Sequence, residues 1–328
     1  MKFATLNDGS RDGVLLVVDK AGTNAVKATT IAPNLQDALE RWDEVSGALQ
    51  ALSDTLNAGT CEDSFEIDFT QLASPLPRSY QWLDGSAFLN HVQLVRKARN
   101  AEMPPSYYHD PLVYQGGSDH FLGPRQDIVH KTTDWGIDFE AEIAVITGDV
   151  PYQATPEQVE PNIRLLMLVN DVSLRSLIPS ELAKSFGFVV SKPPTAFSPF
   201  AITPDELGDS WKDGRVWLPL EVEYNGEFFG NPEAGEEMQF SFYQIISHIA
   251  QTRSLRAGTI VGSGTVSNED RSRGSCCLAE KRMIEKIDTG EFKTPFMQFG
   301  DTVRIEMKKD GQSLFGSIEQ KVVQWEGE

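Results

Sequence analysis

The stretch that decides the fold is DFEAEIAVI, residues 138–146. Side chains alternate faces along a strand, so Glu140 and Glu142 should point the same way, about 7 Å apart. Phe139, Ala141 and Ile143 should point the other way, and the rest of the strand is apolar on both faces. Two carboxylates in a buried strand are unfavourable unless a cation neutralises them, and oxygen ligands suit Mg²⁺, Mn²⁺ or Ca²⁺. The alternative is a strand with a solvated acidic face.

Composition restricts the classes of function. The chain has 328 residues, 40% of them hydrophobic, with 18 Phe, 7 Tyr and 6 Trp, which is enough to bury a large core. Its net charge of −19 disfavours binding to nucleic acid or to anionic membranes, so an anionic substrate needs a local positive site. Three cysteines form neither a disulfide framework nor a zinc site. Without an apolar leader or a long apolar run, we expect a cytoplasmic protein.

The chain divides into a small N-terminal domain, residues 1–77, and a larger domain, residues 78–328. In the small domain we expect a strand at 13–19 and an amphipathic helix of about 22 residues that begins near Asn34 and ends near Gly59. The Pro-rich stretch 71–77 is the expected linker. Short strand patterns dominate the larger domain, which is therefore mainly β.

The expected elements of the larger domain follow from periodicity and turn residues. Asn225-Gly226 and Asp310-Gly311 are typical of two-residue hairpin turns. Strands are predicted at 139–146, 216–224, 259–261, 302–307 and 314–323, and a helix at 241–254.

Three further segments carry residues suited to chemistry. Asp171 follows the buried run 165–169 and is either a helix N-cap or a ligand; if a helix continues to 183, Arg175 lies one turn on. His91, on a predicted helix after residue 85, is either a general base or incidental. The Gly-rich run 258–267 could bind an oxyanion or be only a turn, and it lacks the signature of a nucleotide-binding loop.

Together these segments resemble the fumarylacetoacetate hydrolase family over residues 78–325. The resemblance rests on the order and spacing of several motifs. They are Asp138-x-Glu140-x-Glu142, the run 169–175 (VNDVSLR), the run 191–199 (SKPPTAFSP), the run 262–265 (GSGT) and the run 299–301 (FGD). Residues 114–118 and 121–124 are similar to the substrate-facing segment of long bacterial members. The resemblance implies a mixed β-roll with a small SH3-like N-terminal β domain that carries a helix, and a homodimer.

The resemblance also implies roles for particular residues. Two lysines could lie near the metal; Lys192 is preferred over Lys184 because the following Phe197-Ser198-Pro199 keeps its register. Glu280 is the nearest match to the glutamate that orients the histidine. Ser86 and Ile178 depart from the family pattern, and no role is implied for Cys276 and Cys277. The implied set is metal ligands Asp84, Glu140, Glu142 and Asp171, catalytic His91, Glu280 and Lys192, and substrate-binding Tyr114, Arg175 and Thr265.

The implied activity is metal-dependent hydrolysis of a carbon–carbon bond in a small-molecule 1,3-diketo acid, first of all fumarylacetoacetate, as in tyrosine catabolism. His91 activates water, and the enolate leaving group is stabilised by a divalent ion, Mg²⁺ or Ca²⁺ and otherwise Mn²⁺. The nearer alternative is an acylpyruvate or fumarylpyruvate hydrolase, or a β-keto acid decarboxylase. The more distant one is a non-enzymatic, metal-stabilised β domain.

Overall fold

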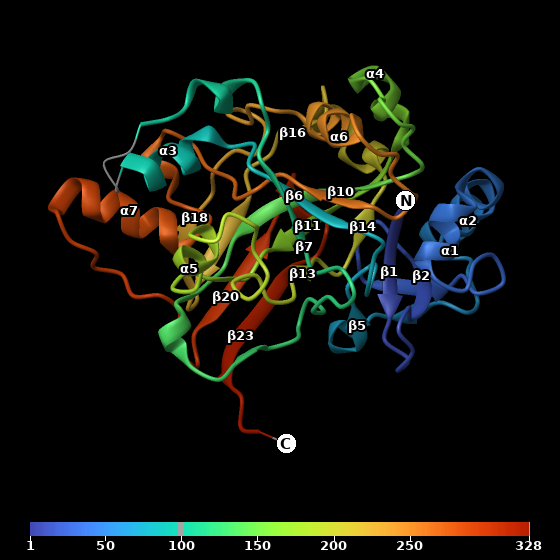
Figure 1. The fold of residues 1–328 in the computed structure, drawn as a ribbon. Coiled ribbons are helices and arrows are strands. Elements are labelled where there is room, and N and C mark those ends of the chain that lie inside the picture. Colours follow the sequence, from blue (N-terminus) through green and yellow to red (C-terminus); the bar gives the residue numbers. More distant parts are fainter. Residues whose placement is uncertain (98–101, 328) are drawn as a thin grey trace.

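A twelve-stranded sheet forms the centre of the computed structural model, which describes residues 1–97 and 102–327 (Figure 1). Ten strands follow the order β4-β3-β2-β1-β14-β11-β10-β19-β6-β7, while β13 pairs with β11 and β5 with β1. Their bounds are β1 Lys2–Leu6, β2 Val14–Val18, β3 Asn24–Lys27, β4 Phe65–Glu66, β5 Leu72–Ala73, β6 Trp82–Gly85, β7 Val113–Gly116, β10 Ala141–Thr147, β11 Ile163–Asn170, β13 Ala196–Phe197, β14 Ala201–Ile202 and β19 Ile260–Gly262.

A second sheet of five strands has the order β18-β17-β20-β23-β8. Three two-stranded pairs, β12–β9, β15–β16 and β21–β22, complete the strands of the described residues. The bounds are β8 Ile128–His130, β9 Ile137–Asp138, β12 Ser173–Leu174, β15 Trp211–Lys212, β16 Arg215–Val216, β17 Glu221–Tyr224, β18 Glu227–Gly230, β20 Thr302–Glu306, β21 Lys308–Lys309, β22 Gln312–Ser313 and β23 Ile318–Gln324.

Helices lie around the sheets, with α1 and α2 on one side of the molecule and the packed pair α3 and α7 on the opposite side (Figure 1). The α-helices are α1 Leu35–Glu40, α2 Trp42–Asn57, α3 Leu89–Lys97, α4 Pro156–Val159, α5 Ile178–Leu182, α6 Phe242–Ala250 and α7 Leu278–Thr289. Short 3₁₀ turns are Phe69–Gln71, Pro105–Tyr108, Thr133–Trp135, Glu160–Asn162, Pro204–Ser210 and Arg271–Arg273. Within residues 1–97 and 102–327, the structure contains no helix whose length and apolarity suffice to cross a bilayer.

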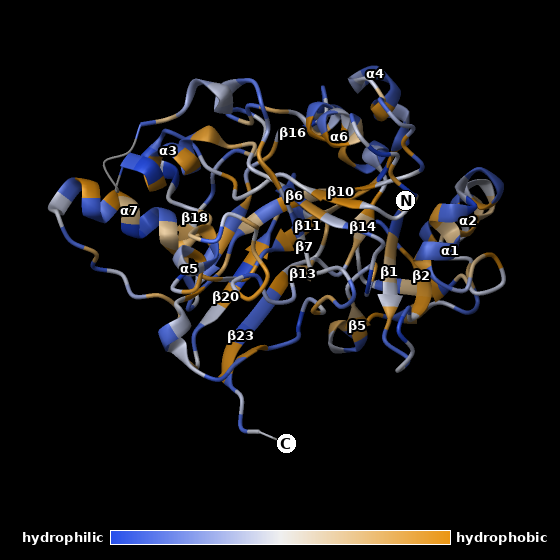
Figure 2. Cartoon of the chain, viewed as in Figure 1, coloured by the Kyte–Doolittle hydropathy of each residue, from blue (hydrophilic) through white to orange (hydrophobic). Residues whose placement is uncertain are grey.

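The core is centred on β10 and β11, whose side chains are almost all buried. Alternate residues of β10 enter two different apolar clusters, with Ile143 and Val145 in one and Ala144 and Ile146 in the other. Both faces of this part of the sheet are therefore covered, which explains its nearly continuous apolar sequence (Figure 2). Any polar side chain placed here is held in a rigid, water-poor setting.

The expected mainly β, mixed fold is confirmed, as are both hairpin turns. Tyr224 pairs with Glu227 across Asn225-Gly226, and Lys309 pairs with Gln312 across Asp310-Gly311. Asn225 and Gly226 both have positive φ, at 53° and 77°, the conformation in which Asn-Gly is favoured.

The prediction of a single helix after Asn34 is wrong, because two helices, α1 and α2, occupy this segment. Asn34 does cap α1 by accepting a hydrogen bond from the Asp37 amide, but Arg41 has a non-helical backbone and separates α1 from α2. At this break the Trp42 ring packs edge-on against Phe3, with ring centroids 6.0 Å apart. The tertiary contact thus interrupts a helix that periodicity alone would continue. The expected linker also contains β5, which pairs with β1.

Several expected boundaries in the larger domain also differ. The strand expected at 139–146 begins only at Ala141. The preceding strand, β9, pairs with β12, whereas β10 pairs with β11 and β19, so the chain changes partner strands between residues 138 and 141. The strand expected at 216–224 is divided around Pro219, which has no amide hydrogen for a ladder. No helix follows Asp171 directly; β12 does, so Asp171 is not an N-cap. The helix expected at 241–254 is the shorter α6, and the strand expected at 314–323 begins at Ile318.

Candidate functional site

Three buried carboxylates meet where the central strands end. Asp84 lies on β6, Glu142 on β10 and Asp171 directly after β11, and one ligand oxygen from each lies within 4.8 Å of the others. Strand β19 lies between β6 and β10, and its Gly262 is paired with Asp84. A Cβ on Gly262 would lie 2.4 Å from Asp84 Oδ1, so glycine is needed there. The amide of Gly264 donates to the same oxygen at 3.0 Å.

The electrostatics of this triad show that it lacks positive charge of its own. Both carboxylate oxygens of Glu142 are buried and accept no hydrogen bond from the residues that the structure describes. Burial, together with the charge of Asp171, raises the pKa of Asp84 well above its usual range. Burial and the charge of Asp84 do the same to the pKa of Glu142. An all-oxygen donor set in which the Glu142 carboxylate has no partner among the described residues fits a hard divalent cation, which would restore the ionised forms.

Asp171 is held by three donors. The hydroxyl of Tyr114 donates to Oδ2 at 2.6 Å, the ammonium of Lys192 donates to the same oxygen, and Thr195 Oγ1 donates to Oδ1 at 2.8 Å. Tyr114 and Lys192 were expected in the site, but Thr195 was not. It could have been found as part of the same SKPPTAFSP motif as Lys192. The other lysine considered, Lys184, lies on the exposed surface.

Glu140 lies beside the triad rather than in it. Its Oε1 accepts a hydrogen bond from Arg175 at 2.7 Å and its Oε2 accepts one from Lys192 at 2.6 Å. Although burial alone would raise the pKa of Glu140, Arg175, Lys192 and His91 hold it below its usual range. The expected common direction of Glu140 and Glu142 assumed a continuous strand. Strand β10 begins only at Ala141, yet Phe139, Ala141 and Ile143 all enter the same apolar cluster, as the expected alternation requires.

Arg175, expected to contact substrate, forms ion pairs with carboxylates of the protein itself. Its guanidinium donates to Asp138 at 2.8 Å as well as to Glu140. Asp138 also accepts the amides of Leu278 and Ala279, the first two residues of α7, at 2.8 and 2.9 Å. Arg175 therefore connects the carboxylates near the triad to the N-terminus of α7.

His91 and Glu280 form a hydrogen-bonded pair. His91 projects from α3 and Glu280 from the first turn of α7, and the distance from His91 Nδ1 to Glu280 Oε2 is 3.1 Å. The Glu280 side chain is only 1% exposed, whereas that of His91 is 17% exposed, so the histidine is the member of the pair that solvent can reach. Thr265, also expected in the site, is buried next to Gly264.

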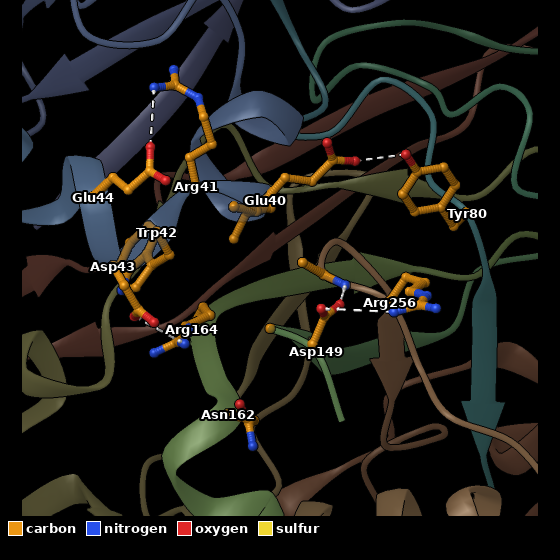
Figure 3. A pocket seen from close by; sticks show the side chains of 13 residues that line it. Glu40, Arg41, Trp42, Asp43, Glu44, Tyr80, Asp149, Asn162, Arg164 and Arg256 are labelled. Carbon is orange, nitrogen blue, oxygen red and sulfur yellow. Dashed lines mark hydrogen bonds and ion pairs between the residues drawn. The ribbon is translucent and has the colours of Figure 1, made fainter. Parts of the chain in front are cut away.

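Two hollows lie away from these residues. One, of about 610 Å³, lies between the α1–α2 break and loops near Arg164 and Arg256 (Figure 3). The other, of about 890 Å³, is lined by residues such as Arg78 and His120. Neither is lined by any residue that the sequence assigned to the site.

Comparison with known proteins agrees with this arrangement. The chain matches the model "Fumarylacetoacetase N-terminal domain 2" over residues 1–78 and the model "Fumarylacetoacetate (FAA) hydrolase C-terminal" over residues 82–323. It is 22% identical to oxaloacetate tautomerase YisK of Bacillus subtilis (strain 168), covering 81% of this chain and 89% of the relative. It is 23% identical to 2,4-didehydro-3-deoxy-L-rhamnonate hydrolase of Sphingomonas sp. (strain SKA58), covering 89% and 92%.

A solved structure shares the fold over the full length. Maleylpyruvate hydrolase from Sphingobium sp. SYK-6, in complex with manganese(II) ion and pyruvate, superposes with a TM-score of 0.64 at 15% identity, covering 99% of each chain. The C-terminal family model alone spans well over half of the present chain, and it includes every candidate residue described above. The chain belongs to the fumarylacetoacetate hydrolase family.

Proposed function

We propose that this protein is a divalent-metal-dependent hydrolase of a carbon–carbon bond in a 1,3-diketo acid, with fumarylacetoacetate as the first substrate to test. The single observation that carries the proposal is that two groups of functional residues lie near each other. One is the triad of buried oxygen ligands with an unpartnered Glu142, and the other is the His91–Glu280 pair. Arg175 joins Glu140 to Asp138, which anchors the first turn of α7 where Glu280 lies. Lys192 joins Glu140 to Asp171 of the triad.

Asp84, Glu142 and Asp171 would hold the ion, and we propose Mg²⁺, Ca²⁺ or Mn²⁺. A divalent ion bound there supplies Lewis-acid polarisation of the substrate oxygens. The manganese in the related maleylpyruvate hydrolase supports this choice of chemistry. Lys192 stays protonated, because Asp171 and Glu140 raise its pKa more than burial lowers it. It limits the negative charge of the site and stabilises oxyanions that develop beside Asp171.

The protein's own residues account for the proton transfers. Glu280 accepts Nδ1–H of His91, which leaves Nε2 free to take a proton from water. The resulting hydroxide adds to a substrate carbonyl, and the carbon–carbon bond breaks in the collapse of the tetrahedral adduct. The electron pair of that bond leaves on the second fragment as an enolate, which is then protonated to complete the hydrolysis.

A direct assay tests the proposal. Metal-stripped protein is mixed with fumarylacetoacetate, and the ultraviolet absorbance is followed with and without Mg²⁺, Mn²⁺ or Ca²⁺. We expect metal-dependent loss of absorbance, with fumarate and acetoacetate in equal amounts, and no such loss with the His91→Ala variant. Folded, metal-loaded protein that leaves fumarylacetoacetate intact would overturn this choice of substrate.

A second candidate is action on a smaller 2-keto acid. It is favoured by the similarity to oxaloacetate tautomerase over 81% of this chain. The same protein should therefore be offered acylpyruvates, fumarylpyruvate and oxaloacetate, with separate measurement of hydrolysis, decarboxylation and keto–enol exchange. Turnover of one of these and none of fumarylacetoacetate selects this candidate. We also propose that the protein is a homodimer, which light scattering of the purified chain would test.

A further inference from the structure

Cys277 contacts both members of the His91–Glu280 pair. It is the N-cap of α7, and its Sγ accepts a hydrogen bond from the amide of Glu280 at 3.4 Å. The same sulfur lies 4.0 Å from His91 Nδ1. Since Cys277 is fully buried, its side chain keeps a fixed position between α7 and the imidazole.

The first turn of α7 is anchored at each of its first three amides. Asp138 accepts the amides of Leu278 and Ala279, and Cys277 accepts that of Glu280. Free amides at a helix N-terminus need such partners. The third of these amides belongs to Glu280, whose carboxylate is hydrogen-bonded to His91. The position of Glu280 is therefore set by Cys277 directly and by Asp138 through the helix.

A thiol suits this position because it is only weakly polar. Burial, followed by the nearby charge of Asp138, raises the pKa of Cys277 well above its usual range, so the group is a neutral thiol. A thiol is a poor donor and a poor acceptor. Next to Nδ1 it therefore competes little with Glu280, whereas a hydroxyl, a stronger donor and acceptor, would compete with Glu280 once a movement of the side chains brought it within hydrogen-bonding distance of the same ring nitrogen.

We propose that Cys277 is a positioning residue for the His91–Glu280 pair, and that its weakly polar sulfur keeps Glu280 the single strong partner of His91 Nδ1. One imidazole tautomer, with the hydrogen on Nδ1 and the base at Nε2, then predominates. The effect on turnover rests on the proposed hydrolysis, but the effect on the tautomer does not.

The neighbouring Cys276 provides a matched control. It is equally buried, but it is part of the apolar core cluster, and its backbone oxygen accepts the amide of Ala141 at 2.9 Å. The Cys276→Ser variant therefore introduces the same buried hydroxyl one residue away from the contact with His91.

The test compares Cys277→Ser, Cys277→Ala and Cys276→Ser as metal-loaded, full-length proteins. Nitrogen-15 NMR of histidine-labelled protein reports the tautomer of His91, and steady-state kinetics separates kcat from KM. Serine is a better N-cap than alanine, so a purely structural role predicts that Cys277→Ser outperforms Cys277→Ala both in melting temperature and in activity.

We expect melting temperature and activity to rank the two Cys277 variants in opposite orders. Cys277→Ser should melt close to the parent but show a mixture of His91 tautomers and a kcat lowered by about ten-fold at unchanged KM. Cys277→Ala should melt lower and yet retain the parent tautomer and more of the kcat. Cys276→Ser should keep the parent tautomer. A single parent-like tautomer in Cys277→Ser, or activities that simply follow melting temperature, would overturn the proposal. If no candidate substrate is turned over, the NMR comparison still decides it.

Discussion

Replacing Glu142 by Gln should separate metal binding from stability. Two unit charges 4.8 Å apart repel by about 3.5 kcal/mol at an effective dielectric constant of ~20. Glu142 takes part in two of the three pairs within the triad, so its charge adds on the order of 7 kcal/mol when all three groups are ionised. Protonation relieves part of this repulsion, as the raised pKa values of Asp84 and Glu142 indicate. The metal-free variant should therefore melt no lower than the metal-free parent.

The metal-loaded proteins should show the opposite order. A ligand at 100 times its dissociation constant stabilises the native state by about 2.7 kcal/mol, which raises the melting temperature of a chain of this size by about 4 °C. Glu142→Gln removes one of three charged ligands. We expect the shift caused by metal to fall below about half of the parent shift at the same metal concentration.

The assay is differential scanning calorimetry in EDTA and in saturating Mn²⁺, with Mn²⁺ affinity measured by titration calorimetry. Glu306→Gln is the matched control, because Glu306 is similarly buried but is paired with Arg304 and Lys308 at 2.6 and 3.0 Å. Losing that paired carboxylate should lower the melting temperature in both conditions and leave the metal shift unchanged. An undiminished metal shift in Glu142→Gln, or a large loss of stability in EDTA, would refute the assignment of Glu142 as a ligand.

Three further predictions test other parts of the site. His91→Gln should lower kcat by at least about 10² while leaving Mn²⁺ affinity at the parent value; normal turnover would exclude His91 as the base. Lys192→Met leaves buried Asp171 without its cation and Glu140 with Arg175 alone, and it should cost about 3–5 kcal/mol of unfolding free energy in chemical denaturation, whereas the exposed Lys184→Met should have little effect. The Ser191 hydroxyl and the backbone amides of residues 189–191 donate hydrogen bonds to Glu181, and together they lower its pKa to about 2. Because the folded pKa is depressed, this anchoring should be complete above the unfolded value near 4.5 and lost as pH falls toward about 2; protection factors for hydrogen exchange at 182–191 that do not fall over this range would contradict it.

The sequence predicted the composition of the site better than its geometry. Asp84, Glu142 and Asp171 were identified from motifs, and strand pairing around Gly262 brings the first two together. The pairing of Glu140 with Arg175 and Lys192 could not be predicted, because these cations lie 35 and 52 residues further along the chain. Long-range pairing of this kind leaves no local periodicity in the sequence.

The same reasoning applies to two further features. The role of Arg175 in substrate binding stays a prediction from its motif, but the motif does not show that its guanidinium is held by Asp138, which also anchors a helix about 140 residues further along the chain. The helix after Asn34 has sound start and stop signals, but the packing of Trp42 on Phe3 decides where it breaks. Local signals defined the elements, and tertiary contacts fixed their boundaries and the pairing of charged groups.

The pairing of β1 with β14 has a consequence for how the chain folds. The two strands are separated by almost 200 residues, yet Lys2 and Phe3 complete the ladder of Ile202 and Ala201. The N-terminal strands therefore join the rest of the sheet through contacts of very high sequence separation. Such contacts favour slow folding, in which the N-terminal strands pair late. Cutting the chain near residue 78 would leave unpaired edges on both fragments, and such edges promote aggregation. Fragments should be soluble chiefly when produced together, with each one covering the exposed strand of the other.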